Sequence, residues 1–352
     1  MQDKTKRIAV FHTGGTISMK QSGQSGLVTQ DANPLAGGLD DFLHARGIEL
    51  VEEQAFAEPV PSPHITEQHM FTLRGKILEA IAGGDIDGVV VTHGTDTLEE
   101  TAYFLDLTDT FRAPIVVTGS MRSNDMPGSD ALHNYRCAIE VAAFGWMFGA
   151  YTVVVFNDQI HAAHEVVKTH STNLAAFSSP ENGPIGALTP DGIVVNRALN
   201  YYFRYSVEQM TKKVLLLKAY AGMDQLLFDA LDALAEKRGN FPIDGLVIEA
   251  MGAGNLPERL VGCLQALAER KIPIVLASRC ITGRVGNVYG YPGGAIHLKK
   301  TLPEIIFSGG LSGVKSRIKL AVLLENGLSL SEIDKQFNWD VHDTLAYFYK
   351  NL

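Results

Sequence analysis

The chain has 352 residues, of which 46% are hydrophobic and 20% charged, and its formal net charge is −9 at pH 7. This length is sufficient for one large domain or two ordinary ones, each with a substantial core. Lys and Arg are dispersed among Asp and Glu, and no apolar run approaches the roughly 18 residues of a membrane-spanning helix, so neither a nucleic-acid nor a membrane partner is expected.

The N-terminal residues, MQDKTKRIAVFHTGG, predict a cytoplasmic protein. Their apolar part, residues 8–11, is too short for the core of a signal peptide. Three cysteines lie far apart in the sequence, and no CxxC occurs. This odd and scattered set indicates neither a disulfide framework nor a zinc clip.

The first half of the chain alternates between apolar runs rich in Val and Ile and longer amphipathic stretches. The apolar runs predict parallel strands that are buried on both faces, at residues 7–12, 88–93, 113–119 and 151–158. The amphipathic stretches predict helices over residues 66–84 and 130–145, each closed by glycine. This alternation is typical of a doubly wound α/β sheet.

The alternation of strand and helix patterns stops from Thr189 to Met210 and then resumes over a shorter part of the chain. The expected strands are residues 212–220, 244–252 and 273–279, and the expected helices are residues 224–239, 257–271 and 312–327. We therefore predict a larger N-terminal α/β domain (1–188), a linker (189–210) and a smaller C-terminal α/β domain (211–352).

Three glycine-rich stretches fail the tests for nucleotide binding. TGGTISMKQSG lacks the G-x-G-x-x-G spacing, GAGNLP is interrupted by Pro257, and in SGGLSGVKSR Val314 separates Gly313 from the lysine that a Walker loop needs. Polar clusters instead follow four of the expected strands: HTGGT, THGTDT, TGSMR and NDQIHAAHEVVKTHSTN. Ligands of open α/β sheets bind beyond the carboxyl ends of strands, and threonine hydroxyls, an aspartate and a lysine suit nucleophilic acyl transfer.

Two of these clusters resemble the motifs of the bacterial L-asparaginase and glutaminase-asparaginase family. The resemblance rests on TGGTI at residues 13–17 and HGTDTLEETAYFLDLT at residues 93–108, and it extends through TGSMR and VVKTHSTNLAAFSS. It continues more weakly through GAGNLP and the last helices, so it covers nearly the whole chain. The fold implied is a larger N-terminal and a smaller C-terminal α/β domain. The activity implied is hydrolysis of L-asparagine to L-aspartate and ammonia, without a metal or organic cofactor.

The resemblance also implies roles for individual residues. Thr16 matches the family's nucleophile, and Thr95, Asp96 and Lys168 match its Thr–Asp–Lys group. The hydroxyl of a threonine is a poor nucleophile until a base takes its proton, which a partly desolvated lysine can do. Which threonine attacks first stays open. Backbone amides near Met121 and the Thr95 hydroxyl are the expected donors to the oxyanion.

Further residues are expected to bind the substrate. Ser62 aligns with the serine that contacts the α-carboxylate of the substrate, and Asn255 with a residue contributed by the neighbouring subunit. Family members are dimers or tetramers, so we expect a homodimer or homotetramer. The loop after TGGTI lacks the tyrosine of secreted members, with Leu27 near its place. We hypothesise that Tyr289 of the adjacent subunit replaces it, with Tyr291 as the rival.

Other interpretations of these residues were weighed. His161 and His164 stand at a spacing that metal ligands can have on a helix, but no HExxH pattern supports a metal site, and none is expected. His93 is expected to pack and hydrogen-bond rather than act as the base. The alternatives to L-asparaginase are a glutaminase-asparaginase, since one methylene is worth only about 1–3 kcal/mol of discrimination, and a non-catalytic amino-acid sensor.

Overall fold

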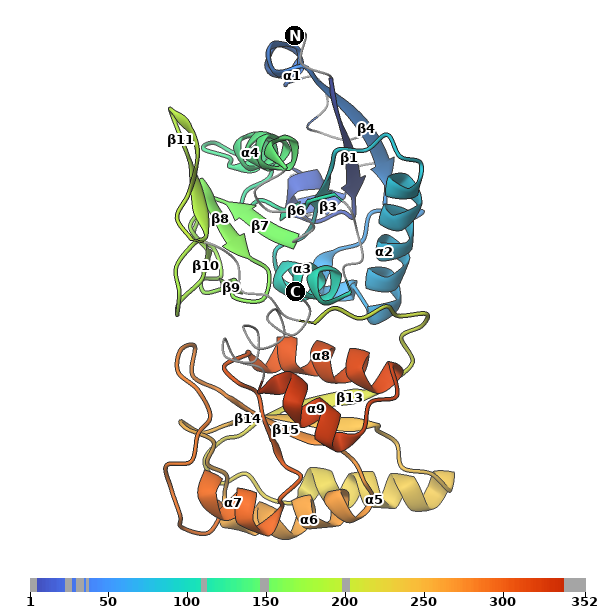
Figure 1. Cartoon of the computed structure of the whole chain (residues 1–352), viewed down its shortest axis with the longest axis vertical. Helices are drawn as coiled ribbons and strands as arrows, with labels where there is room; N and C mark the ends of the chain where they lie inside the picture. Colours follow the sequence, from blue (N-terminus) through green and yellow to red (C-terminus); the bar gives the residue numbers. More distant parts are fainter. Residues whose placement is uncertain are drawn as a thin grey trace, which may run out of the picture. The chain divides into compact units, whose positions relative to one another are not determined.

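The chain folds into two compact units, Met1–Leu199 and Asn200–Leu352 (Figure 1). The computed structural model describes residues 5–22, 27–29, 35, 38–108, 113–145, 152–197 and 203–338. The stretch 189–210, expected to link the domains, contributes strand β12 (Gly192–Val195) to the first unit. The apolar run in GIVV is too short to distinguish this strand from a linker in the sequence.

The first unit is built on an eight-stranded sheet with the order β12-β11-β8-β7-β6-β5-β1-β4. Neighbouring strands from β4 to β7 are parallel, as the continuous apolar runs predicted, whereas β7, β8, β11 and β12 pair antiparallel. The bounds are β1 Lys6–His12, β4 Ile48–Gln54, β5 Gly88–Thr92, β6 Ile115–Thr118, β7 Thr152–Phe156, β8 Gln159–Ala162 and β11 Gly186–Thr189.

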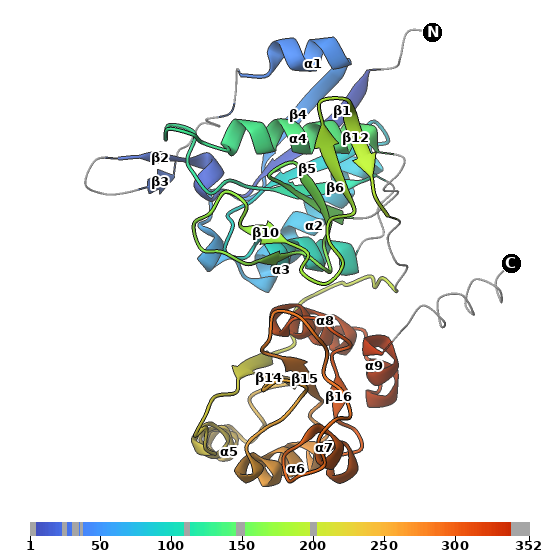
Figure 2. The same ribbon diagram turned by 90° about the vertical axis from the view of Figure 1, so that its left-hand side faces the viewer.

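Helices cover both faces of this sheet. Figure 2 shows α1 (Asp40–Arg46) and α4 (Ala131–Phe144) on one side, and α2 (Glu67–Ala82) and α3 (Leu98–Leu107) on the other. Side chains of alternate strand residues, such as Ile8 and Val10, pack with α4 in one buried cluster. Two short hairpins complete the unit: β2 (Met19–Gln21) with β3 (Leu27–Thr29), and β9 (Val167–Lys168) with β10 (Phe177–Ser178).

The second unit contains a four-stranded parallel sheet with the order β13-β14-β15-β16. Its core is a cluster of aliphatic side chains on one face and a smaller cluster under α8 and α9 on the other. The bounds are β13 Val214–Lys218, α5 Leu226–Arg238, β14 Gly245–Ala250, α6 Val261–Glu269, β15 Ile274–Ser278, α7 Ala295–Thr301, β16 Ile306–Phe307, α8 Gly313–Glu325 and α9 Leu330–Phe337.

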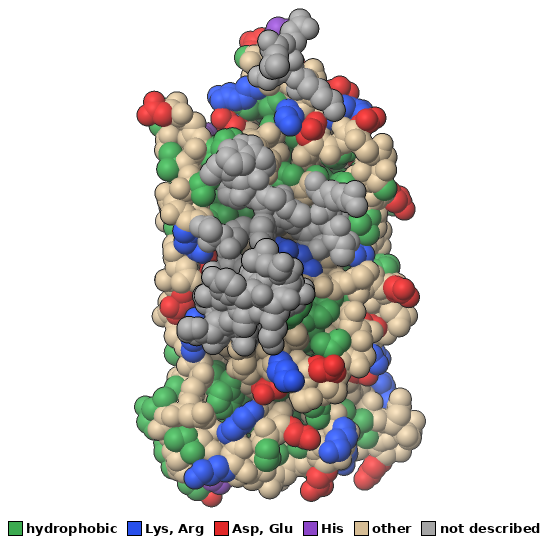
Figure 3. All heavy atoms as spheres, in the orientation of Figure 1, with side chains coloured by type: hydrophobic (Ala, Val, Ile, Leu, Met, Phe, Trp, Pro, Cys, Tyr) green, Lys and Arg blue, Asp and Glu red, His purple; other side chains and the backbone are tan. Residues whose placement is uncertain are grey.

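The surface carries charges of both signs. Figure 3 shows Lys and Arg side chains interspersed with Asp and Glu over the visible face of the described residues, as the sequence predicted. Among the helices that the structure describes, none combines the length and the apolar composition needed to cross a membrane.

Candidate active site

The parallel strands bring their polar carboxyl-terminal segments to one edge of the sheet. His12 of β1 stands opposite Thr92 of β5, and Thr92 stands opposite Thr118 of β6. The backbone continues this alignment beyond the strands, because the Thr13 amide donates to the Thr92 carbonyl and the His93 amide donates to the Thr118 carbonyl. The segments that follow β1, β5 and β6 therefore start side by side.

Two glycines let the first two of these segments touch. A Cβ placed on Gly15 would lie 2.2 Å from the Gly94 Cα, and one placed on Gly94 would lie 2.6 Å from the Ser62 Cβ. Gly15 also has a φ of 84°, a conformation that residues with a Cβ rarely adopt. Thr16 and Thr95 each follow one of these two glycines, so both hydroxyls stem from backbones in direct contact.

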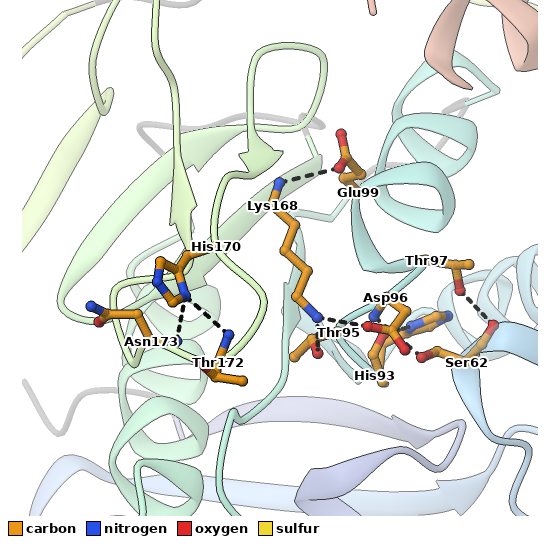
Figure 4. A network of polar contacts seen from close by, with 11 residues as sticks. Ser62, His93, Thr95, Asp96, Thr97, Glu99, Lys168, His170, Thr172 and Asn173 are labelled. Carbon is orange, nitrogen blue, oxygen red and sulfur yellow. Dashed lines mark hydrogen bonds and ion pairs between the residues drawn. The ribbon is translucent and has the colours of Figure 1, made fainter. Parts of the chain in front are cut away.

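Lys168 joins the second threonine to the aspartate beside it. Its Nζ donates to Thr95 Oγ1 over 2.8 Å and to Asp96 Oδ1 over 2.7 Å (Figure 4). The Lys168 side chain is 14% exposed and that of Asp96 is 60% exposed, while Thr95 is buried. The structure thus brings together three of the four predicted catalytic residues, with the Asp96 carboxylate facing solvent and the Lys168 side chain largely covered.

The hairpin formed by β9 and β10 carries Lys168 to this position. Lys168 stands opposite Phe177 in the hairpin, and its own amide donates to Glu99 Oε1 of α3 over 3.1 Å. His170 stabilises the loop of the hairpin, because its Nδ1 accepts hydrogen bonds from the amides of Thr172 and Asn173 (Figure 4). Lys168 is therefore fixed through its backbone at both the hairpin and the helix.

Ser62 lies against the same cluster, in the short 3₁₀ helix Ser62–His64. Its Oγ accepts the amide of Asp96 over 3.2 Å, and its carbonyl accepts the Thr97 hydroxyl over 2.8 Å. Ser62 is buried. The serine hydroxyl thus helps hold the backbone of the HGTDT segment and retains its own proton for a further acceptor.

Two amides in the segment where oxyanion donors are expected, those of Met121 and Arg122, bond to a carboxylate in this structure. The Met121 amide donates to Asp130 Oδ2 over 3.0 Å, and the neighbouring Arg122 amide donates to Asp130 Oδ1 over 3.0 Å. The Asp130 carboxylate, at the N-cap of α4, therefore holds the backbone of residues 121–122 in place. Because these two N–H groups have a charged acceptor in this structure, an oxyanion would have to compete with Asp130 for them. Amides near Met121 and the Thr95 hydroxyl stay the predicted donors.

His93 is buried and has both ring nitrogens engaged. Nδ1 donates to the Gly94 carbonyl over 2.8 Å, and Nε2 pairs with Thr101 Oγ1 over 2.9 Å. Burial lowers the pKa of His93 to about 4, against an opposing effect of the bond to Gly94. The imidazole is therefore neutral at pH 7 with its lone pair occupied, which agrees with the expected packing role.

The remaining predicted residues lie in the second unit. Asn255 follows β14, where its backbone pairs with Met251 and its side-chain Oδ1 is buried. Tyr289 and Tyr291 are both exposed, and their rings lie 5.5 Å apart at 37°. These three residues thus belong to the second unit and the Thr95–Asp96–Lys168 cluster to the first. Asn255 lies in the loop after β14 and the tyrosines in the loop after β15, and backbone hydrogen bonds join the two loops.

Sequence reasoning missed the residues that support the cluster. Glu99, Gly94, Asp130 and His170 each hold a catalytic or adjacent segment through backbone contacts. The one signal that the sequence offered for Glu99 and Gly94 was their place within the long HGTDTLEETAYFLDLT match. His161 and His164, considered as metal ligands, instead contact Ser179 and Glu165.

Comparison with known proteins gives matches over both units. The family described as "Asparaginase, N-terminal" matches residues 7–201, and "Glutaminase/Asparaginase C-terminal domain" matches residues 213–337. The "Probable L-asparaginase" of Deinococcus radiodurans is 37% identical, with 95% of this chain and 98% of the relative covered. The L-asparaginase of Bacillus licheniformis is 34% identical, with 91% and 95% covered. A solved structure of the probable cytoplasmic L-asparaginase from Campylobacter jejuni is 28% identical with a TM-score of 0.80, covering 94% of this chain and 99% of that one.

Proposed function

Because this chain belongs to the asparaginase family, we propose that it is an L-asparaginase that hydrolyses the side-chain amide of L-asparagine to L-aspartate and ammonia. One observation carries the proposal. Lys168 Nζ lies within hydrogen-bond distance of both the Thr95 hydroxyl and the Asp96 carboxylate. A buried hydroxyl next to an amine that an aspartate orients is the arrangement that a proton relay to a threonine requires.

In the proposed mechanism, Thr16 or Thr95 adds to the amide carbon of the substrate. Lys168, kept in place by Asp96, accepts the hydroxyl proton directly or through the other threonine, and that proton passes on to the departing amine. Ammonia leaves and an aspartyl ester forms on the threonine. Water, activated by the same relay, then hydrolyses the ester and regenerates the hydroxyl.

Substrate holding is proposed for residues around this relay. The Ser62 hydroxyl, which keeps a proton to donate, would bind the α-carboxylate, and the exposed Asp96 carboxylate would bind the α-ammonium. Asn255, with its buried and unpartnered Oδ1, and the exposed Tyr289 or its rival Tyr291 would complete the site from a neighbouring subunit.

The proposed assembly is a homodimer or homotetramer, and the proposed location is the cytoplasm. The apolar or aromatic side chains exposed on one loop region of the second unit support the assembly; they belong to Ile281, Val288, Tyr289 and Tyr291. The Campylobacter jejuni structure, described as a probable cytoplasmic L-asparaginase, supports the location.

The test is ammonia release by purified protein from L-asparagine and from L-glutamine, each over a concentration series. We expect turnover of L-asparagine that falls by at least about a thousandfold in Thr16→Ala and in Lys168→Met, because each removes a group that only the transition state uses. The control is Lys76→Met, which removes a lysine that donates to the Gln54 carbonyl, and it should retain activity.

Each outcome assigns the function. Turnover of L-asparagine alone supports the L-asparaginase. Comparable rates on both amides assign a glutaminase-asparaginase of the same mechanism. Tight binding of L-asparagine without ammonia release, in protein with native circular dichroism, would replace the enzyme with a sensor.

A further inference from the structure

Three side chains of metal-binding type converge in the first unit, apart from the Thr95–Asp96–Lys168 cluster. They come from α4 and from the turn between β7 and β8, which α4 packs against (Figure 1). His133 Nε2 lies 2.6 Å from Asp158 Oδ1. Cys137 Sγ lies 3.6 Å from His133 Nε2 and 3.7 Å from Asp158 Oδ1. One nitrogen, one sulfur and one oxygen ligand atom therefore face a common point.

The local structure holds these three groups in place. His133 and Cys137 are four residues apart on α4, so they share one face of the helix. Asn157 and Asp158 form the two-residue turn between β7 and β8, with φ values of 50° and 63° that Asn and Asp tolerate. The Asn157 amide donates to Asn134 Oδ1 over 3.1 Å. The turn is thereby fastened to α4 directly beside His133.

The spacing of the ligand atoms suits a tetrahedral ion of the size of zinc. Zn–S bonds of about 2.3 Å and Zn–N or Zn–O bonds of about 2.0–2.1 Å place sulfur about 3.6 Å from either lighter ligand, and nitrogen about 3.3 Å from oxygen. The two observed separations from sulfur match. The nitrogen–oxygen pair must widen, and both side chains are free to do so because His133 is 56% and Asp158 53% exposed. Cys137 is 5% exposed and lies at the buried side of the three-residue cluster.

We propose that His133, Cys137 and Asp158 bind a divalent cation of the zinc type, with water in the fourth position. Thiolate and imidazole ligands favour Zn²⁺ over Mg²⁺ or Ca²⁺, which prefer oxygen. On binding, the Cys137 thiol releases its proton to solvent, His133 binds through Nε2 with its ring proton on Nδ1, and no electron is transferred. The ion would clamp α4 to the β7–β8 turn, so its role is structural.

The test uses the full chain without an affinity tag, freed of metal by chelation, and Co²⁺ as the probe. Titration should give one equivalent of bound Co²⁺, with the intense visible bands of a tetrahedral site and a thiolate-to-cobalt band in the near ultraviolet. Zn²⁺ should displace Co²⁺ and raise the melting temperature, because the ion binds only the folded state.

Two variants and one control make the result decisive. Asp158→Asn, which the left-handed turn accommodates, should weaken Co²⁺ binding by at least about tenfold, and Cys137→Ser should abolish the sulfur band. The double variant Cys263→Ser, Cys280→Ser removes the two more exposed thiols and should leave the spectrum unchanged. Absence of stoichiometric binding, or a sulfur band that survives in Cys137→Ser or vanishes in the control, would overturn the site.

Discussion

Lys168 is positioned by its main chain, which pairs with Phe177 in the hairpin and bonds to the carboxylate of Glu99. Glu99 lies in the first turn of α3 and is buried, and its Oε1 accepts the Lys168 amide over 3.1 Å. The same helix follows directly on Thr95 and Asp96. A single turn of α3 thus fixes the lysine relative to both of its partners, and a displacement of 1 Å at such a site costs about a hundredfold in rate.

We expect Glu99→Ala to lower kcat by about tenfold to a hundredfold with little change in KM, because Lys168 loses its backbone acceptor while substrate contacts remain. Glu99→Gln keeps a carbonyl oxygen at the same place and should recover most of the rate. Steady-state kinetics with L-asparagine, beside thermal denaturation, measure both effects. Glu100→Ala removes a neighbouring carboxylate and serves as the control. Equal losses in the Ala and Gln variants would show that charge, and not the hydrogen bond, matters.

At this scale the sequence predicted candidate reactive groups but not the residues that support them. Thr95, Asp96 and Lys168 were named because their segments resemble the family's motifs, and the structure brings the three side chains together. The bond from the Met121 amide to Asp130, nine residues further along the chain, was not predicted. No local sequence pattern predicts which carboxylate will accept a hydrogen bond from a loop amide.

Among the elements, the segments after β1 and β5 depend on glycine for their approach. A Cβ on Gly94 would meet the Ser62 Cβ at 2.6 Å, the Ser62 Oγ at 2.7 Å and the Gly15 Cα at 3.1 Å. Two of these contacts are with the short, buried side chain of Ser62, and the third is with the backbone of Gly15. None of these atoms is the far end of a flexible side chain that could move aside. The segments must therefore move apart to accept even the smallest side chain.

We predict that Gly94→Ala reduces kcat/KM by at least about a hundredfold and destabilises the protein by about 1–3 kcal/mol, because overpacking here displaces Thr95 and Ser62. Urea denaturation and steady-state kinetics measure the two effects. Gly75→Ala is the matched control, since Gly75 lies inside α2 with open space around its missing Cβ. That variant should keep full activity and gain stability. A Gly94→Ala enzyme with wild-type kinetics would contradict the close packing described above.

Elements with long apolar runs were predicted well, whereas short antiparallel strands were not. The runs that became β1, β5, β6 and β7 are buried on both faces and are continuous. Strands β9 and β10 contain two residues each, and their pairing, which positions Lys168, is set by the loop between them. Two residues carry no period, so the hairpin could be found only in the folded chain.

The whole molecule distributes the predicted site over two units. The Thr95–Asp96–Lys168 cluster and Ser62 belong to the first unit, and Asn255 and Tyr289 belong to the second. The sequence indicated two α/β domains because the alternation of strands and helices lapses and resumes. That the second domain of a neighbouring copy serves each site is implied only by the family resemblance, since assembly does not follow from any local pattern.

If each site takes Asn255 from a neighbouring subunit, two inactive variants should complement each other. In a mixed dimer of Thr16→Ala and Asn255→Ala subunits, one site combines both substitutions and the other combines none. Random exchange makes half of the dimers mixed, so dissociation and reassembly of an equimolar mixture should restore about one quarter of wild-type activity. Ammonia release before and after reassembly measures this recovery, with each variant reassembled alone as the control.

If Asn255 instead served the site of its own chain, every site would carry a substitution, and the activity of the mixture would stay at the average of the two variants. Full activity of Asn255→Ala alone would remove that residue from the site altogether.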